Sequence, residues 1–213
     1  EFGGAYVHFH QRNLMNSIFE DNSIDTTICN STTHELWSYG EREISLRGYI
    51  EKKFAQTRPG GRLVIRDVVG PENKMDEVWM FVSTHDGSND NPYKTFEDQA
   101  QLAAYLGGLS TYARFMRFAQ DYLQDMRSSG RRGMDTKIDF HEEKIGDKTY
   151  IVTTLKNAVE FMTKKDYVDN WQSELNEEFA FWSFSEWKNE LAHAGFKVVE
   201  NPNDETLSRS YSN

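Results

Sequence analysis

The chain has 213 residues, 38% of them hydrophobic, a length that fits one large domain or a core with a sizeable insertion. Its formal net charge of −10 argues against nucleic acid as an obligatory partner, because phosphate contacts need an excess of lysine and arginine. The single cysteine, Cys29, cannot form an internal disulfide, which favours a reducing, cytoplasmic setting. No apolar run reaches the roughly 18 residues that cross a bilayer, so no membrane partner is expected.

The first third of the chain alternates predicted strands with a helix. Residues 5–10, 24–29 and 62–67 are short runs of β-forming residues and predict three strands. Residues 44–54 place their apolar side chains on one helical face, and Pro59 with two glycines ends that helix. This order predicts an α/β fold with a doubly wound sheet, whose parallel strands are buried on both faces.

The remainder of the chain is predicted to be mainly helical. Residues 74–82, 96–106 and 112–126 predict three helices, and residues 138–154 resemble a hairpin. Residues 158–175 predict a helix that breaks near Lys164. Ser183 and Glu186 have the spacing of a capping box, Gly195 ends the helix that follows, and residues 197–200 predict a last strand.

Four segments, in this order, resemble class I S-adenosylmethionine-dependent methyltransferases. The run IFEDNSID, residues 18–25, is similar to the acidic turn before the fourth strand of that family, and ICNSTTHE, residues 28–35, to the strand and its loop. The run TRPGGRLVIRD, residues 57–67, resembles the Pro-Gly-Gly turn that leads into the fifth strand. Residues 184–199 resemble the capped helix and strand that close the family's fold.

The resemblance implies a partial Rossmann-like doubly wound sheet with a mainly helical insertion after the fifth family strand. Residues 1–70 and 183–213 would form the methyltransferase core, and residues 71–182 a lid or an interface. The family's glycine-rich loop, and the acidic residue that holds the ribose, have no counterpart here. We therefore expect the rest of the sheet to lie on another polypeptide or to have been removed, and this piece alone to bind cofactor poorly.

Polar residues at the predicted strand ends are candidate cofactor ligands, because open α/β sheets bind ligands at the carboxyl ends of their strands. The resemblance implies that Asn13 contacts the adenine amino group, with the Leu14 backbone beside the ring. It places Asn30 and Ser31 near the methionine part of S-adenosylmethionine. We expect Asn13, Asn30 and Asp67 to line one cleft rim, although either asparagine could simply close a turn.

His34 and Glu35 are the candidate catalytic residues. Methyl transfer needs alignment and often a base, and the pKa of histidine suits that task near neutral pH. The alternative is that Glu35 contacts the start of a helix and His34 packs as a satisfied histidine. Position 38 is serine, so the pair is not a zinc-protease motif. No metal site is predicted.

The sequence therefore predicts methyl transfer from S-adenosylmethionine to a small or medium-sized acceptor. The alternative is a non-catalytic methyltransferase-like subunit or interaction module, with self-association or a partner chain completing the sheet. Aromatic and arginine side chains of the insertion could line an acceptor pocket, although at helical spacing they more often form a core: Tyr112, Arg114, Phe115, Arg117, Phe118, Tyr122, Tyr167, Trp171, Phe179, Phe181 and Trp182.

Overall fold

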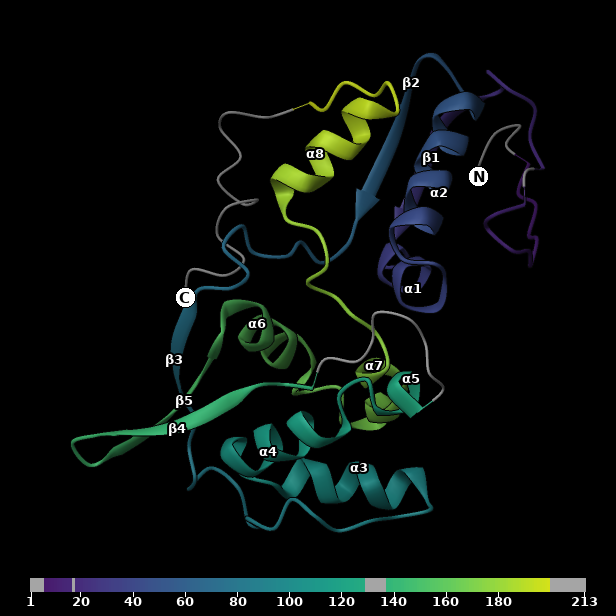
Figure 1. Ribbon diagram of the computed structural model, residues 1–213. Coiled ribbons are helices and arrows are strands. Elements are labelled where there is room, and N and C mark those ends of the chain that lie inside the picture. Colours follow the sequence, from purple (N-terminus) through teal and green to yellow (C-terminus); the bar gives the residue numbers. More distant parts are fainter. Residues whose placement is uncertain (1–5, 17, 129–136, 200–213) are drawn as a thin grey trace.

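The computed structural model describes residues 6–16, 18–128 and 137–199. Its elements follow in the order β1 (Ile24–Asn30), α1 (Thr33–Tyr39), α2 (Glu43–Gln56), β2 (Thr57–Arg66), β3 (Glu77–Phe81), α3 (Gln99–Gly108), α4 (Thr111–Asp121), α5 (Gln124–Ser128), β4 (Phe140–Ile145), β5 (Lys148–Thr154), α6 (Leu155–Lys164), a short 3-10 helix (Val168–Asn170), α7 (Trp171–Leu175) and α8 (Phe184–His193). Figure 1 shows β1, β2, α1, α2 and α8 gathered in one lobe and β3 to α7 in a second.

The first lobe is built on a parallel pair of strands, β1 and β2, joined through α1 and α2. Strand β1, helix α2 and strand β2 confirm the elements predicted between residues 24 and 67. The two strands are not buried on both faces as predicted. Ile28 and its register partner Val64 are 72% and 44% exposed, whereas the neighbouring Cys29 is buried. The alternation shows that the helices cover one face only.

The predicted strand over residues 5–10 is wrong: residues 6–10, the part that the structure describes, do not form a strand. Residues 6–10 lie in no strand, and Tyr6 and Phe9 are 89% and 91% exposed. The reason is that β-propensity reflects packing against neighbouring strands, and no described strand lies beside this segment. The fold is therefore mixed α/β, with a two-stranded parallel sheet and a separate antiparallel sheet.

The second lobe contains the antiparallel sheet, in the order β3-β5-β4. The predicted helix over residues 74–82 is wrong, because residues 77–81 form strand β3 paired with β5. In β3 the half-buried Val78 and Met80 alternate with the exposed Trp79 and Phe81, a period of two that a strand requires. The predicted hairpin is confirmed as β4 and β5, with Gly146 at a positive φ in its turn.

The helices of the second lobe enclose an aromatic core. The prediction over residues 96–106 is confirmed as α3, and that over 112–126 is divided into α4 and α5 at Leu123, which has a φ of 54°. The predicted break near Lys164 is confirmed, since α6 ends there. Phe115, Phe118 and Trp171 are fully buried. These aromatic side chains therefore form a core, as their helical spacing favours.

Helix α8 closes the first lobe. Its capping box is confirmed, with the Ser183 hydroxyl accepting from the backbone N–H of Glu186 and the Glu186 carboxylate accepting from the N–H of Ser183. The predicted final strand does not form over residues 197–199, and residue 200 lies outside the described residues. Phe181 and Trp182 pack in the first lobe's core, although the sequence assigned them to the insertion.

Among the described residues no helix combines the length and apolar character that spanning a bilayer needs.

Gly195, which follows α8, has a backbone conformation that favours glycine, so we expect a substitution there to destabilise the fold. Gly195 has a φ of 105°, and a Cβ there would lie 2.5 Å from Cζ of Phe54. Gly195→Ala should lower the free energy of unfolding by about 1–3 kcal/mol, measured by urea denaturation. Gly107→Ala is the matched control, because it lies in α3 with open space around it and should stabilise by about 0.5–1 kcal/mol. Equal effects of the two substitutions would contradict this explanation.

Candidate functional site

The carboxyl ends of β1 and β2 meet, as the parallel pairing requires. Asn30 ends β1 opposite Arg66, and Arg66 donates from Nη1 to the Asn30 side-chain oxygen at 3.0 Å. Ser31 follows with a φ of 49°, and its N–H donates to the Arg66 carbonyl at 2.8 Å. Asn30 and Ser31 are exposed. Asn30 and Ser31 therefore lie at the carboxyl end of β1 and directly after it, and both face solvent.

Asp67, the residue after β2, joins that strand to the start of α1. Its Oδ2 accepts from the backbone N–H groups of Thr32 and Thr33 and from the Thr33 hydroxyl, at 3.1, 2.7 and 2.6 Å. Asp67 thus satisfies the helix N-terminus in place of a local cap. Burial alone would raise the Asp67 pKa, but the hydrogen bonds from His34 and Thr33 outweigh it and lower the pKa to about 2.

His34 is held between two carboxylates. Its Nδ1 lies 2.6 Å from Oδ1 of Asp67, and its Nε2 lies 3.2 Å from Oε2 of Glu177. The Phe179 ring packs against it with the centroids 4.6 Å apart. Burial by itself would lower the His34 pKa, but the hydrogen bonds to Asp67 and Glu177 outweigh it and raise the pKa to about 9.

A histidine in this state is an imidazolium at neutral pH, with both ring nitrogens donating. It has no lone pair with which to accept a proton from a substrate. The geometry therefore favours the packed, satisfied histidine over the general base. Glu35 is exposed in the first turn of α1, so of the two predicted catalytic residues it alone presents its side chain to solvent.

The segment that supplies Glu177 ties the two lobes together. Glu178 accepts from Nε1 of Trp37 at 2.9 Å and from Nη2 of Arg42 at 2.5 Å, and it also pairs with Lys156 of α6. Burial would raise the Glu178 pKa, but Lys156 and Arg42 outweigh it and lower the pKa. Residues from both lobes thus converge on one buried carboxylate.

A fully buried ion pair lies behind this segment. Glu160 pairs with Lys164 one turn along α6, and its Oε1 accepts from the backbone N–H groups of Phe179 and Ala180 at 2.9 and 2.6 Å. The Lys164 ammonium lies 3.5 Å from the Phe179 ring centroid. The second carboxylate oxygen of Glu160 and the ammonium of Lys164 thus each have a further partner, which offsets part of the cost of burying the pair.

Sequence reasoning missed six charged residues of this network: Arg42, Lys156, Glu160, Lys164, Glu177 and Glu178. Two signals could have found four of them. Glu177 and Glu178 directly precede an aromatic run, and Glu160 stands between apolar residues on a helix with Lys164 four positions later. A carboxylate on an apolar helical face needs a partner, so the spacing itself predicts a buried pair.

The structure does not bring Asn13 and Leu14 to the strand ends. The Asn13 side chain accepts from the backbone N–H of Met15 at 2.9 Å, which closes a turn, and Leu14 is 42% exposed. Met15 packs beside α2, where its methyl lies 3.7 Å from the site of a Cβ on Gly48. The expected rim formed by Asn13, Asn30 and Asp67 on three strands is therefore wrong, because Asn13 follows no strand.

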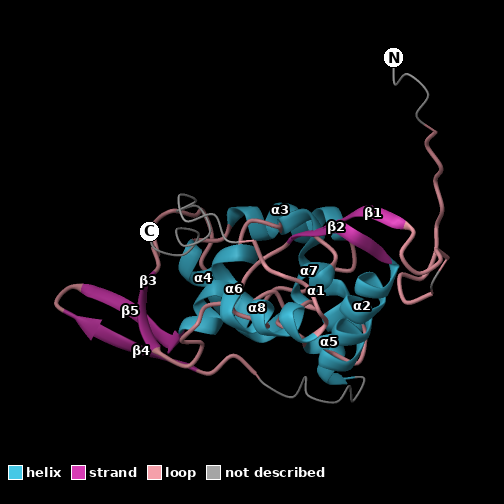
Figure 2. Ribbon diagram, turned by 90° about the horizontal axis from the view of Figure 1, so that it is seen from above, coloured by secondary structure: helices cyan, strands magenta, loops and turns pink. Residues whose placement is uncertain are grey.

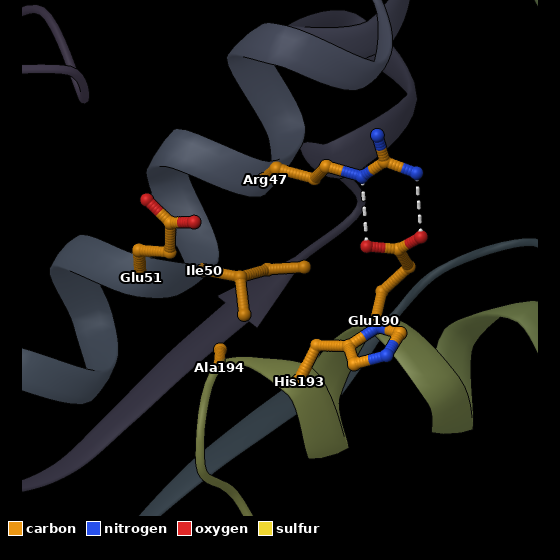
Figure 3. A pocket seen from close by; sticks show the side chains of 6 residues that line it. All are labelled: Arg47, Ile50, Glu51, Glu190, His193 and Ala194. Carbon is orange, nitrogen blue, oxygen red and sulfur yellow. Dashed lines mark hydrogen bonds and ion pairs between the residues drawn. The ribbon is translucent and has the colours of Figure 1, made fainter.

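A cavity of about 360 Å³ lies between α2 and α8. Figure 3 shows the side chains of the two helices facing each other, with Arg47 and Glu190 joined by two hydrogen bonds of 2.8 and 2.7 Å. None of the strand-end residues Asn30, Ser31, His34 and Asp67 lines this cavity.

Within residues 6–16, 18–128 and 137–199, no group of three histidine, cysteine or acidic side chains is arranged to hold a metal ion.

His34→Gln tests the ion bridge, and Glu35→Gln is its neighbouring control. A folded-state pKa raised from 6.5 to about 9 gives a stabilisation that is complete below pH 6.5 and lost as the pH rises through 9. His34→Gln should lower the free energy of unfolding at pH 6 by about 3 kcal/mol, because it leaves two buried carboxylates unpaired. The deficit should shrink at pH 9.5. Glu35→Gln should change the free energy of unfolding by less than about 0.5 kcal/mol. A deficit independent of pH would contradict the ion bridge.

Comparison with known proteins gives no relative on which to base a family. No protein-family model, no curated protein and no solved structure matches the chain. The functional interpretation therefore depends on the residues and geometry of the chain itself.

Proposed function

We propose that the chain forms part of an S-adenosylmethionine-dependent methyltransferase, with the cofactor at the carboxyl ends of β1 and β2. The observation that supports this best is the parallel β1–α2–β2 unit, because the first three of the four family-like segments lie on it or directly beside it, in consecutive order. Ligands of open α/β sheets bind at that edge. The methyl acceptor is proposed to be a small or medium-sized molecule.

The described residues fit such a cofactor in part. Asn30 and Ser31 are exposed at the end of β1 and are available to hold its methionine portion, whereas Asn13 and Leu14 lie in a turn against α2. The cofactor supplies an electrophilic methyl group on a sulfonium. The chain's own contribution would be alignment, through Asn30 and Ser31 on a strand end fixed by Asp67. Glu35 is the candidate for holding the acceptor's proton.

A second candidate function is a non-catalytic, methyltransferase-like subunit. Two observations favour it. Both ring nitrogens of His34 are engaged in buried ion pairs. The outer face of the β1–β2 pair is exposed at Ile28 and Val64, although parallel sheets are normally covered on both sides. A partner chain, or a second copy, would then complete the sheet.

Calorimetric titration of the intact protein with S-adenosylhomocysteine distinguishes the two functions. The enzyme hypothesis predicts measurable binding, weakened about five-fold in Asn30→Ala through loss of one hydrogen bond. Thr26→Ala is the control, because Thr26 is exposed on the same face of β1 but far from its carboxyl end. Absence of heat, or equal effects of the two substitutions, would contradict cofactor binding at this edge and favour the subunit.

A further inference from the structure

Trp79 is exceptional among the five tryptophans of the chain. Trp79 on β3 is 49% exposed, whereas Trp37, Trp171, Trp182 and Trp187 are at most 7% exposed. Burying an indole is strongly favourable, so a half-exposed one in a chain that buries all the others suggests a role at the surface.

The indole of Trp79 is held in place. Its Nε1 donates to Oε2 of Glu143 on β4 at 2.6 Å, across the intervening strand β5. Val152, the β5 residue in register with Trp79, is 1% exposed although it lies on the same face. The indole therefore reaches across β5 toward β4, while about half of its surface stays exposed. A ring that is already ordered loses little entropy when a partner stacks on it.

The neighbouring side chains extend this surface and give it acidic character. Phe81 is 56% exposed, and its ring centroid lies 5.8 Å from that of Tyr150. The ammonium of Lys148 already lies over the Phe81 ring, 5.4 Å from its centroid. By strand alternation, the carboxylate of Glu77 lies on the same face as Glu143. The chain as a whole carries a charge of −10.

We propose that this outer face of the β3-β5-β4 sheet docks a protein segment that carries arginine. The guanidinium stacks on the exposed face of Trp79, and the carboxylate of Glu143, which already contacts that indole, pairs with it. Aromatic faces attract cations, tryptophan most strongly, and arginine both stacks and binds carboxylates. The negative field of the chain favours the approach of such a segment. This inference does not depend on the methyltransferase proposal.

The position of the sheet allows such docking. Figures 1 and 2 show the β4–β5 hairpin extending away from the helices, so that a partner reaches it without displacing any of the described helices. The outer edge of β4 is also unpaired within the described residues, since β4 is the last strand of the sheet. An extended segment can therefore lie along the hairpin and place alternate side chains on the aromatic face.

The test uses the acetylated, amidated peptide Arg-Thr-Arg-Thr-Arg and the intact protein labelled with ¹⁵N at its tryptophan indoles. The proposal predicts that the indole resonance of Trp79 shifts on titration while the four buried indoles do not. The same peptide with citrulline in place of arginine, which keeps the shape and loses the charge, should bind about two- to five-fold more weakly. No shift of Trp79, or equal affinity for the citrulline peptide, overturns the proposal.

Variants check the assignment by fluorescence anisotropy of the labelled arginine peptide. Trp79→Ala and Glu143→Gln should each weaken binding at least two-fold, whereas Tyr93→Ala, at an exposed aromatic residue outside this face, should not. Glu143→Gln keeps the test valid if Trp79→Ala fails to fold. Unchanged affinity in Glu143→Gln overturns the proposal, and so does self-association through Trp79 without peptide, because a second copy would then be the occupant.

Discussion

The buried imidazolium of His34 is balanced on one side by Asp67 and on the other by Glu177. Asp67 belongs to the end of β2 and also satisfies the first N–H groups of α1. Glu177 belongs to the segment that returns from the second lobe. One ring thus joins three parts of the chain, and removing its charge leaves both carboxylates without their buried counterion. The pairs made by Glu178 and by Glu160 continue the same network into α6.

This network constrains what the strand ends can do. The residue best suited by its ordinary pKa to proton transfer is charged and engaged on both nitrogens, so it fixes geometry instead. The exposed groups beside it, Asn30, Ser31 and Glu35, are the ones that we propose contact a ligand. A strand end held rigid by buried charges, with polar side chains facing solvent, is suited to positioning a bound molecule.

Local pattern was sufficient for much of the fold. The β1–α2–β2 order, the hairpin at Gly146 and the capping box of α8 each arise from residues close in sequence. The errors came where neighbouring elements decide the outcome. Residues 6–10 have strand-forming side chains, but no strand that the structure describes lies beside them. The pattern of residues 74–82 predicts a helix, whereas residues 77–81 form a strand that pairs with β5 some 70 positions away. Of the site, Asn30, His34 and Asp67 were predicted from the sequence. Glu177, the second partner of His34, and the neighbouring Glu178 were not, because no local pattern brings position 34 to position 177.

The charge state of His34 is the most direct test of this account. A ¹H–¹⁵N spectrum of the intact protein that correlates the imidazole ring atoms reports whether both nitrogens carry protons, and titration gives the pKa. We predict that both are protonated at pH 7 and that the ring titrates near pH 9. A ring that is neutral at pH 7 and titrates near the ordinary value of about 6.5 would contradict the ion bridge and return His34 to the candidates for a general base.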